Sequence, residues 1–200
     1  MKLSILIPSI PSRLSMLKDL LEELDRQSKG LDVEILALSD NCKRQVGIKR
    51  NSLMQMAKGE YITHLDDDDF VAPDYIETIL DCINNGTKPD VICFKSRSYI
   101  DDEPPFIVST SLAYENEESR YVDVNAKLRN NIRRKPWHWC VWKKEIAIKG
   151  SFPSDFYFGD DWHWLQQVIP FCVTETLIDR ELHIYRHKTA LRDSSGMATN

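Results

Sequence analysis

The sequence predicts an α/β protein with an open, largely parallel sheet that carries helices on both faces. Apolar strand-like runs alternate with helical patterns from residue 3 to residue 94, which is the order of a parallel sheet. Small polar or acidic residues follow three of these runs, where such sheets bind ligands. No repeat or linker divides the 200 residues, a length that fits one domain. We therefore expect a single domain over residues 1–200.

Each expected element of the first half has its own local signal. Pro8 ends the first apolar run, Ser12 is a candidate N-cap, and leucines recur after it at helical spacing. Gly59 ends the second helix, Pro73 opens the third, and Asn85-Gly86 ends it. The expected order is strand 3–8, a helix after Ser12, strand 33–38, helix 43–57, strand 61–65, a helix from Pro73 and strand 91–94.

The second half has a different composition. All five tryptophans lie between residues 137 and 164. Residues 96–124 indicate short strands and loops, and residues 160–169 indicate a helix. Two strands, 171–178 and 181–187, are expected to be joined tightly.

Composition narrows the class of protein and its location. With 31 acidic and 26 basic residues the net charge is −5, which disfavours binding to duplex nucleic acid or an anionic membrane. No apolar run approaches the roughly 20 residues of a transmembrane helix, and the N-terminal run is too short for a secretory signal. The five cysteines form no C-x-x-C pair, so we expect reduced thiols and a cytoplasmic location.

The polar residues that follow the strands are the candidate ligand-binding groups. The first strand is followed by a short segment that ends at Arg13, and the second by Asp40, which could also be a turn residue or helix cap. Asp66 to Asp69 follow the third strand. Four adjacent carboxylates repel one another, and they suit Mg²⁺ or Mn²⁺, which in turn binds phosphate oxygens. The alternative is a solvated acidic run that caps the next helix.

Several motifs together resemble the family 2 glycosyltransferases. GIKRNSLMQMAKGEYITHLDDDDF follows the family's pattern of Gly, Arg-Asn, Ala-x-Gly-Glu-Tyr-Ile and Asp-x-Asp-Asp, and SILIPSIPSR and LALSDN resemble its first two strands. GSFPSDFYFGDDWHWL resembles the segment that holds the family's catalytic base. Asp160 stands where the family usually has Glu, and Asp161 stands at the position of the family's Asp. HIYRHK resembles the terminal Tyr-Arg-x-His motif, which makes His187 a candidate ligand, with His183 on the same strand face as the competing one.

The resemblance implies a GT-A fold, which is a Rossmann-like nucleotide-binding open sheet in an α/β/α sandwich with a C-terminal acceptor-side portion. It implies a nucleotide-sugar-binding half over about residues 1–95 and an acceptor-binding and catalytic-base half over about 96–200. The implied reaction is metal-dependent transfer of a sugar, with inversion, from a nucleotide-diphosphate sugar, most simply a UDP-sugar, to a glycan, lipid-linked or protein acceptor.

The same resemblance assigns roles to individual residues. Asp161 is the expected base and Asp160 the second candidate. Asp68 and His187 are expected to bind Mn²⁺ or Mg²⁺, while Asp66 contacts ribose or the cation's waters. Flat indoles such as Trp139 can stack on a sugar, although core packing is the alternative. The expected nucleotide-sugar contacts are Pro8, Ser9, Ile10, Arg13, Asp40, Arg50, Asp66, Asp67 and Trp139.

Two other function classes remain open from the sequence. A nucleotidyltransferase that makes a sugar nucleotide usually carries a Gly-rich phosphate loop after its first strand, and residues 8–13 contain no glycine. A non-catalytic sugar-binding module of the same fold would not need the carboxylates at Asp68 and Asp161.

Overall fold

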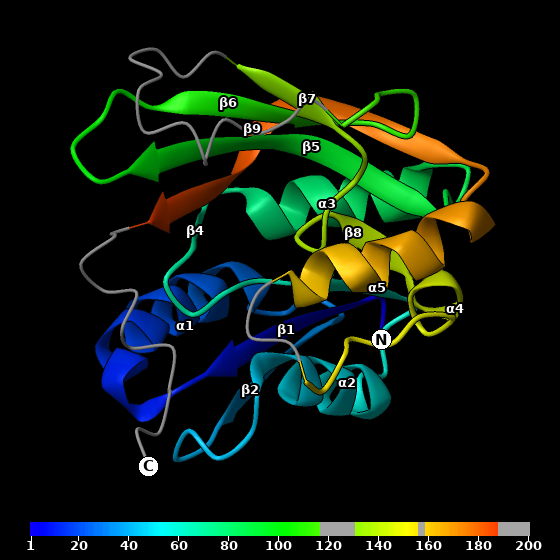
Figure 1. Ribbon diagram of the computed structural model, residues 1–200. Helices are drawn as coiled ribbons and strands as arrows, with labels where there is room; N and C mark the ends of the chain where they lie inside the picture. The colour runs from blue at the N-terminus through cyan, green and yellow to red at the C-terminus, as the bar shows by residue number, and fades with distance from the viewer. Residues whose placement is uncertain (117–130, 156–158, 188–200) are drawn as a thin grey trace.

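The computed structural model describes residues 1–116, 131–155 and 159–187 (Figure 1). Residues 3–56, in blue to cyan, form the lower part of the view in Figure 1, and the green and orange strands of residues 91–110 and 175–187 lie above them. The elements in chain order are β1 (Leu3–Ser9), the 3-10 turn η1 (Pro11–Arg13), α1 (Leu14–Ser28), β2 (Val33–Ser39), α2 (Val46–Met56), β3 (Tyr61–His64), β4 (Phe70–Val71), α3 (Tyr75–Asn85), β5 (Val91–Ile100), β6 (Phe106–Thr110), β7 (Ile132–Arg134), β8 (Val141–Lys143), α4 (Lys144–Ala147), α5 (Asp160–Val168), η3 (Ile169–Phe171) and β9 (Glu175–His187).

The first half has the predicted parallel arrangement. β1 lies between β2 and β3 and is parallel to both. The chain therefore moves to one side of β1 and then to the other, and right-handed crossovers place α1 and α2 on opposite faces. α1 packs against α3, whereas α2 packs on β1 and β2 and contacts α5. The open α/β sheet expected from the sequence is confirmed.

The start of α1 differs from the expectation. Ser12 lies inside η1, the helix begins at Leu14, and its N-cap is Arg13, with no side-chain capping bond. Because Pro11 opens a 3-10 turn there, Ser12 comes too early to cap α1. Leu17, Leu20 and Leu24 form the buried stripe, as their spacing predicts.

The second half enters the same sheet. β8 lies between β3 and β5 and is antiparallel to both. β5 pairs with β8 at its first two residues, with β6 further along, and with β9 along its other edge. The two halves expected from the resemblance are therefore joined by one continuous sheet.

The last strand corrects a second expectation. Residues 175–187 form the single strand β9, parallel to β5, in place of two strands joined by a turn. The polar residues Asp179 and Arg180, which resemble a turn in the sequence, lie where the register between β5 and β9 shifts. Asp179 forms an ion pair with Lys95, and Arg180 forms one with Asp74 at 2.8 Å. Both charged side chains at this irregularity are therefore paired.

Some of the tryptophans belong to the core. Trp142 and Trp164 are fully buried, and Trp164 stacks on Phe152 with ring centroids 4.9 Å apart. The aromatic composition of the second half therefore reflects packing as well as the site described below. The five cysteines are free thiols. None of the helices in the described residues is long and apolar enough to cross a membrane.

Candidate active site

The four aspartates that follow β3 have different partners. An Arg50 amino group donates to Asp66 at 2.6 Å. The Ser9 hydroxyl and the Arg13 guanidinium donate to Asp67 at 2.8 and 3.0 Å. The run is therefore folded into a compact turn rather than extended into solvent.

Asp68 is the least compensated carboxylate of the run. It contacts Arg13 at 3.1 Å, and its side chain is 26% exposed. Burial, and then the charges of Asp69 and Asp66, raise the pKa of Asp68 to about 7 against the opposing effect of Arg13. A further positive charge near Asp68 would therefore stabilise its carboxylate at neutral pH.

Asp69 connects the run to β9. Its Oδ2 accepts the Asp66 N–H at 2.9 Å and lies 2.9 Å from His183 Nε2. Its Oδ1 is buried without a hydrogen-bond partner among the described residues. Asp68 and Asp69 thus offer carboxylate oxygens that the described part of the chain satisfies only in part. The sequence places Asp69 in the acidic run, but only the structure distinguishes it as a candidate cation ligand.

His183, and not His187, lies against the aspartate run. Its Nδ1 is 2.8 Å from the Ser96 hydroxyl, and its ring stacks on Trp139 with centroids 5.0 Å apart. The β5–β9 register is regular from His183 to His187, so four residues of strand separate them by about 13 Å. His187 stacks on Tyr185 instead. The terminal motif predicts that His187 lies near the aspartates. The structure places His183 there instead.

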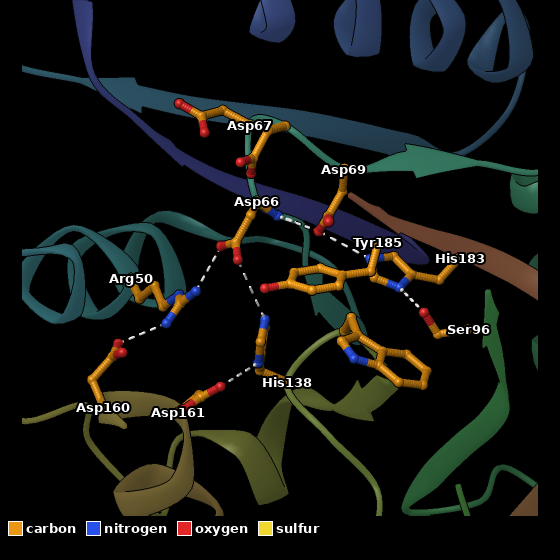
Figure 2. Close-up of polar contacts among 12 residues, drawn as sticks. Arg50, Asp66, Asp67, Asp69, Ser96, His138, Asp160, Asp161, His183 and Tyr185 are labelled. Carbon is orange, nitrogen blue, oxygen red and sulfur yellow. Dashed lines mark hydrogen bonds and ion pairs between the residues drawn. The ribbon is translucent and has the colours of Figure 1, made fainter. Parts of the chain in front are cut away.

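Arg50 joins the aspartate run to α5. Its two amino groups donate to Asp66 and Asp160, each at 2.6 Å (Figure 2). Burial opposes its charge, but the carboxylates outweigh burial and raise the pKa of Arg50. The expected role of Arg50 was to reach a base or phosphate. With both amino groups held by carboxylates, it serves in this arrangement to fix the two acidic segments relative to each other.

Neighbouring positions on α2 hold the same junction. The side-chain amide of Asn51 donates to the Phe152 carbonyl at 2.7 Å, and its oxygen accepts the backbone N–H of Phe152 at 2.9 Å. A Cβ atom on Gly47 would meet the Pro153 carbonyl oxygen at 2.3 Å, so only glycine fits there. The Gly47, Arg50 and Asn51 pattern therefore positions residues 152–153 and Asp160 against the first half.

Asp160 and Asp161 begin α5, and they face different ways. Asp160 is 5% exposed and pairs with Arg50. The Asp161 carboxylate accepts the Trp162 N–H at 2.8 Å through Oδ1, and its Oδ2 lies 3.3 Å from His138 Nδ1. The N-cap of α5 is Gly159 at φ 76°, so Asp161 is not the capping residue. Burial would raise the pKa of Asp161, but the His138 hydrogen bond and the charges of His138 and Arg50 lower it.

A cavity of about 280 Å³ connects these groups. Asp66 and Asp69 contribute to it from the aspartate run and Asp161 from α5. Trp139 is 6% exposed and lines the cavity while it packs on Phe94, so it takes part in both the site and the core. The full lining is Asp66, Asp69, Ser96, Ser98, Val108, Arg134, Trp137, His138, Trp139, Asp161, His183 and Tyr185.

A second polar group lies at the ends of β1 and β2. The Lys49 ammonium donates to Asp40 at 3.1 Å and to the Ser9 carbonyl at 2.7 Å. Arg44 donates to Asp40 from its backbone and its side chain, at 3.0 and 3.2 Å. Burial acts to raise the pKa of Asp40, but these bonds lower it, so it is a carboxylate acceptor at neutral pH. Sequence reasoning missed Lys49, because a lysine inside a helical pattern looks like a solvated one.

The remaining predicted contacts lie along the same edge. Pro8 is buried in β1, and Ile10 is half-buried immediately before η1. Both therefore stand between the Asp40 group and the aspartate run, with Ser9 bonded to each side.

The open sheet with acidic groups at the carboxyl ends of its parallel strands, and a further carboxylate on a helix beside the same cavity, matches the GT-A type fold. Residues 18–151 match the family described as Glycosyl transferase family 2, and the chain belongs to that family. No match among curated protein sequences reaches significance.

Solved structures of S. aureus TarS have a similar fold. The structure described as TarS has a TM-score of 0.61 and 12% identity, over 93% of this chain and 37% of that one. The structure of TarS 1–349 in complex with UDP-GlcNAc has a TM-score of 0.61 and 13% identity, over 93% of this chain and 58% of that one. The structure with UDP has a TM-score of 0.60 and 13% identity, over 93% and 60%. This chain thus spans less than two thirds of each.

Proposed function

We propose that this chain is an inverting glycosyltransferase that takes a sugar from a UDP-sugar and passes it to an acceptor hydroxyl. Family membership supports sugar transfer, and the TarS structures of similar fold are described as complexes with UDP and UDP-GlcNAc. The observation that carries the proposal is that Asp161 faces the same cavity as Asp66 and Asp69, whereas Asp160 is held by Arg50.

The proposed step is a single displacement at the anomeric carbon. The acceptor oxygen forms a bond to this carbon as the bond from carbon to the diphosphate oxygen breaks, and the diphosphate leaves with the electron pair. The acceptor's proton passes to Asp161, a carboxylate that stays ionised until the hydroxyl becomes acidic in the transition state. Attack opposite the leaving group inverts the centre, so no covalent enzyme intermediate is needed.

The aspartate run fits a divalent cation, Mn²⁺ or Mg²⁺. The carboxylate oxygens of Asp68, which Arg13 compensates only in part, and the unpartnered Oδ1 of Asp69 are hard oxygen ligands. No group of three or more metal-ligating side chains is found in the described ranges. Such a cation commonly binds one or two carboxylates and takes its other ligands from phosphates and water. When bound, it would neutralise charge on the departing diphosphate.

Donor turnover tests the proposal. Purified protein is incubated with a panel of UDP-sugars and Mn²⁺, and release of UDP is followed with water as the acceptor. NMR of the first sugar formed gives its anomeric configuration, which should be opposite to that of the donor. Release of pyrophosphate from a sugar phosphate and UTP would instead identify a nucleotidyltransferase. Binding of UDP-sugars without any release of UDP, whether water or a sugar hydroxyl is the acceptor, would identify a non-catalytic module.

A further inference from the structure

His138 has a fixed position beside the aspartate run. The carbonyl of the preceding Trp137 accepts the Cys140 N–H and the Trp142 indole N–H, both at 2.9 Å. The His138 carbonyl accepts the N–H of His64, the last residue of β3, at 3.3 Å. The His138 side chain is only 7% exposed. The turn at residues 137–140 therefore holds the His138 imidazole next to the end of β3.

The imidazole of His138 lies between two carboxylates, as Figure 2 shows. Its Nδ1 is 3.3 Å from Asp161 Oδ2, and its Nε2 is 3.9 Å from Asp66 Oδ2. In the described residues Nδ1 makes no well-aligned hydrogen bond, and its 3.3 Å contact with Asp161 is a close charge contact. The nearest acceptor for a proton on Nδ1 is therefore Asp161, while Nε2 is too far from Asp66 for a direct hydrogen bond.

This contact defines the direction in which Asp161 can act. Oδ1 of Asp161 accepts the N–H of Trp162, the next residue, and Oδ2 faces His138. Together the two contacts restrain rotation of the carboxylate, which lines the cavity. A base that must meet a hydroxyl in one geometry gains rate from such restraint.

We infer that His138 is a positioning residue for Asp161, which it holds through a hydrogen bond from Nδ1–H. The inference rests on the proposed function, because it assigns Asp161 the proton of the acceptor hydroxyl. His138 keeps its own Nδ1 proton throughout, and the acceptor proton ends on Asp161.

Two substitutions of His138 separate this role from simple packing. The amide nitrogen of Asn stands as many bonds from Cα as Nδ1 does, whereas that of Gln corresponds to Nε2. UDP release from UDP-GlcNAc with Mn²⁺ is measured for His138→Asn, His138→Gln and the matched control His163→Gln, which changes an exposed residue of α5. We expect His138→Gln to lower kcat by about 10-fold or more with little change in KM, and His138→Asn to stay within about 3-fold. Equal kcat values for all three variants would overturn the inference.

A spectroscopic measurement tests the contact without any turnover. Nitrogen-15 NMR of the histidine rings, assigned by the signals lost in His138→Gln, reports which ring nitrogen carries the proton. We expect a proton on Nδ1 of His138 and a shift of that signal in Asp161→Asn. An unprotonated Nδ1, or a signal that Asp161→Asn leaves in place, would overturn the inference. Lack of UDP release by the unaltered protein alongside the expected spectrum would count against the proposed function alone.

Discussion

Asp160 and Asp161 are adjacent in the sequence, yet their carboxylates have opposite surroundings. Asp160 is buried against Arg50, and Asp161 opens into the cavity beside His138. The family resemblance names Asp161 as the base, but the sequence gives no physical ground for that ranking, because neighbouring residues of an α-helix point about 100° apart and the pattern does not show what each one meets. The ranking comes from Arg50, a residue of α2 that lies 110 positions away from Asp160.

The first prediction concerns Asp161→Asn. Asparagine keeps the size of the side chain, so the fold and UDP affinity should be retained. It cannot accept the acceptor's proton, so turnover of the donor should fall by about 10²-fold or more. Steady-state UDP release and calorimetry with UDP measure the two effects separately. Near-normal turnover in a folded Asp161→Asn protein would remove Asp161 from the mechanism.

The second prediction concerns Asp68 and pH. The pKa of Asp68 is raised to about 7 in the folded chain, above its value of 3.8 in a model peptide. Ionised Asp68 therefore destabilises the fold above pH 7, and this effect fades as the pH falls from about 7 towards 4. With chelator present, Asp68→Asn should raise the free energy of unfolding at pH 8 by about 1–2 kcal/mol, or about 2–8 °C in Tm. The increase should be much smaller at pH 5.

Thermal unfolding at the two pH values checks this second prediction. Asp19→Asn, on the exposed surface of α1, is a suitable control and should show no such difference. The same gain at pH 8 and pH 5 would mean that ionisation of Asp68 is not the cause.

At the scale of elements, α2 is the part that joins the two halves of the site. Gly47, Arg50 and Asn51, which lie on one face of α2, contact residues 152–153 and Asp160. From the sequence, Arg50 is expected to contact the base or phosphate of the substrate, whereas Gly47 and Asn51 only match the family pattern. Their spacing of three and four residues does predict one face of a helix, but not what that face meets, because the partner segment is about a hundred residues away.

The third prediction is that Asn51→Ala destabilises the chain. It removes the two hydrogen bonds to the Phe152 backbone and leaves one buried donor and one acceptor unpaired, at a cost of about 1–3 kcal/mol. Ser52→Ala is the matched control, because the Ser52 hydroxyl bonds only within α2, to the Ile48 carbonyl at 2.9 Å. Urea unfolding measures both variants. Equal midpoints would show that the α2 junction contributes little to stability.

At the scale of the whole molecule, the parallel part of the sheet could be predicted and its completion could not. Apolar runs and helix signals locate β1, β2, β3 and the helices between them within a few residues. β8 is only three residues long, and its apolar pattern is too short to be distinguished from the tryptophan-rich loop before it. β9 was divided in two because Asp179-Arg180 resembles a turn. Lys49 and His138 were missed because their roles arise from contacts between distant segments.

The fourth prediction concerns donor binding, which would involve both the aspartate run and the group around Asp40. UDP should bind at least about 10-fold more weakly when a chelator removes divalent cations, because the diphosphate would meet the negative charge of the aspartate run. Uridine, which has no phosphates, should bind equally well with and without chelator, since its base and ribose contacts would be made near Asp40. Calorimetry with both ligands distinguishes the two cases. If UDP affinity is indifferent to chelator, the cation has no part in donor binding.

The position of β8 also has a consequence for how the chain is made. The edge of β3 is completed only when residues 141–143 pair with it. During synthesis at about 5–20 residues per second, roughly 80 further residues separate β3 from its neighbour, a delay of about 4–16 seconds. For that interval the nascent sheet exposes an apolar, unpaired edge at its centre, which is the kind of surface that pairs with other chains. The strand that completes the sheet is thus also the one that covers this aggregation-prone edge.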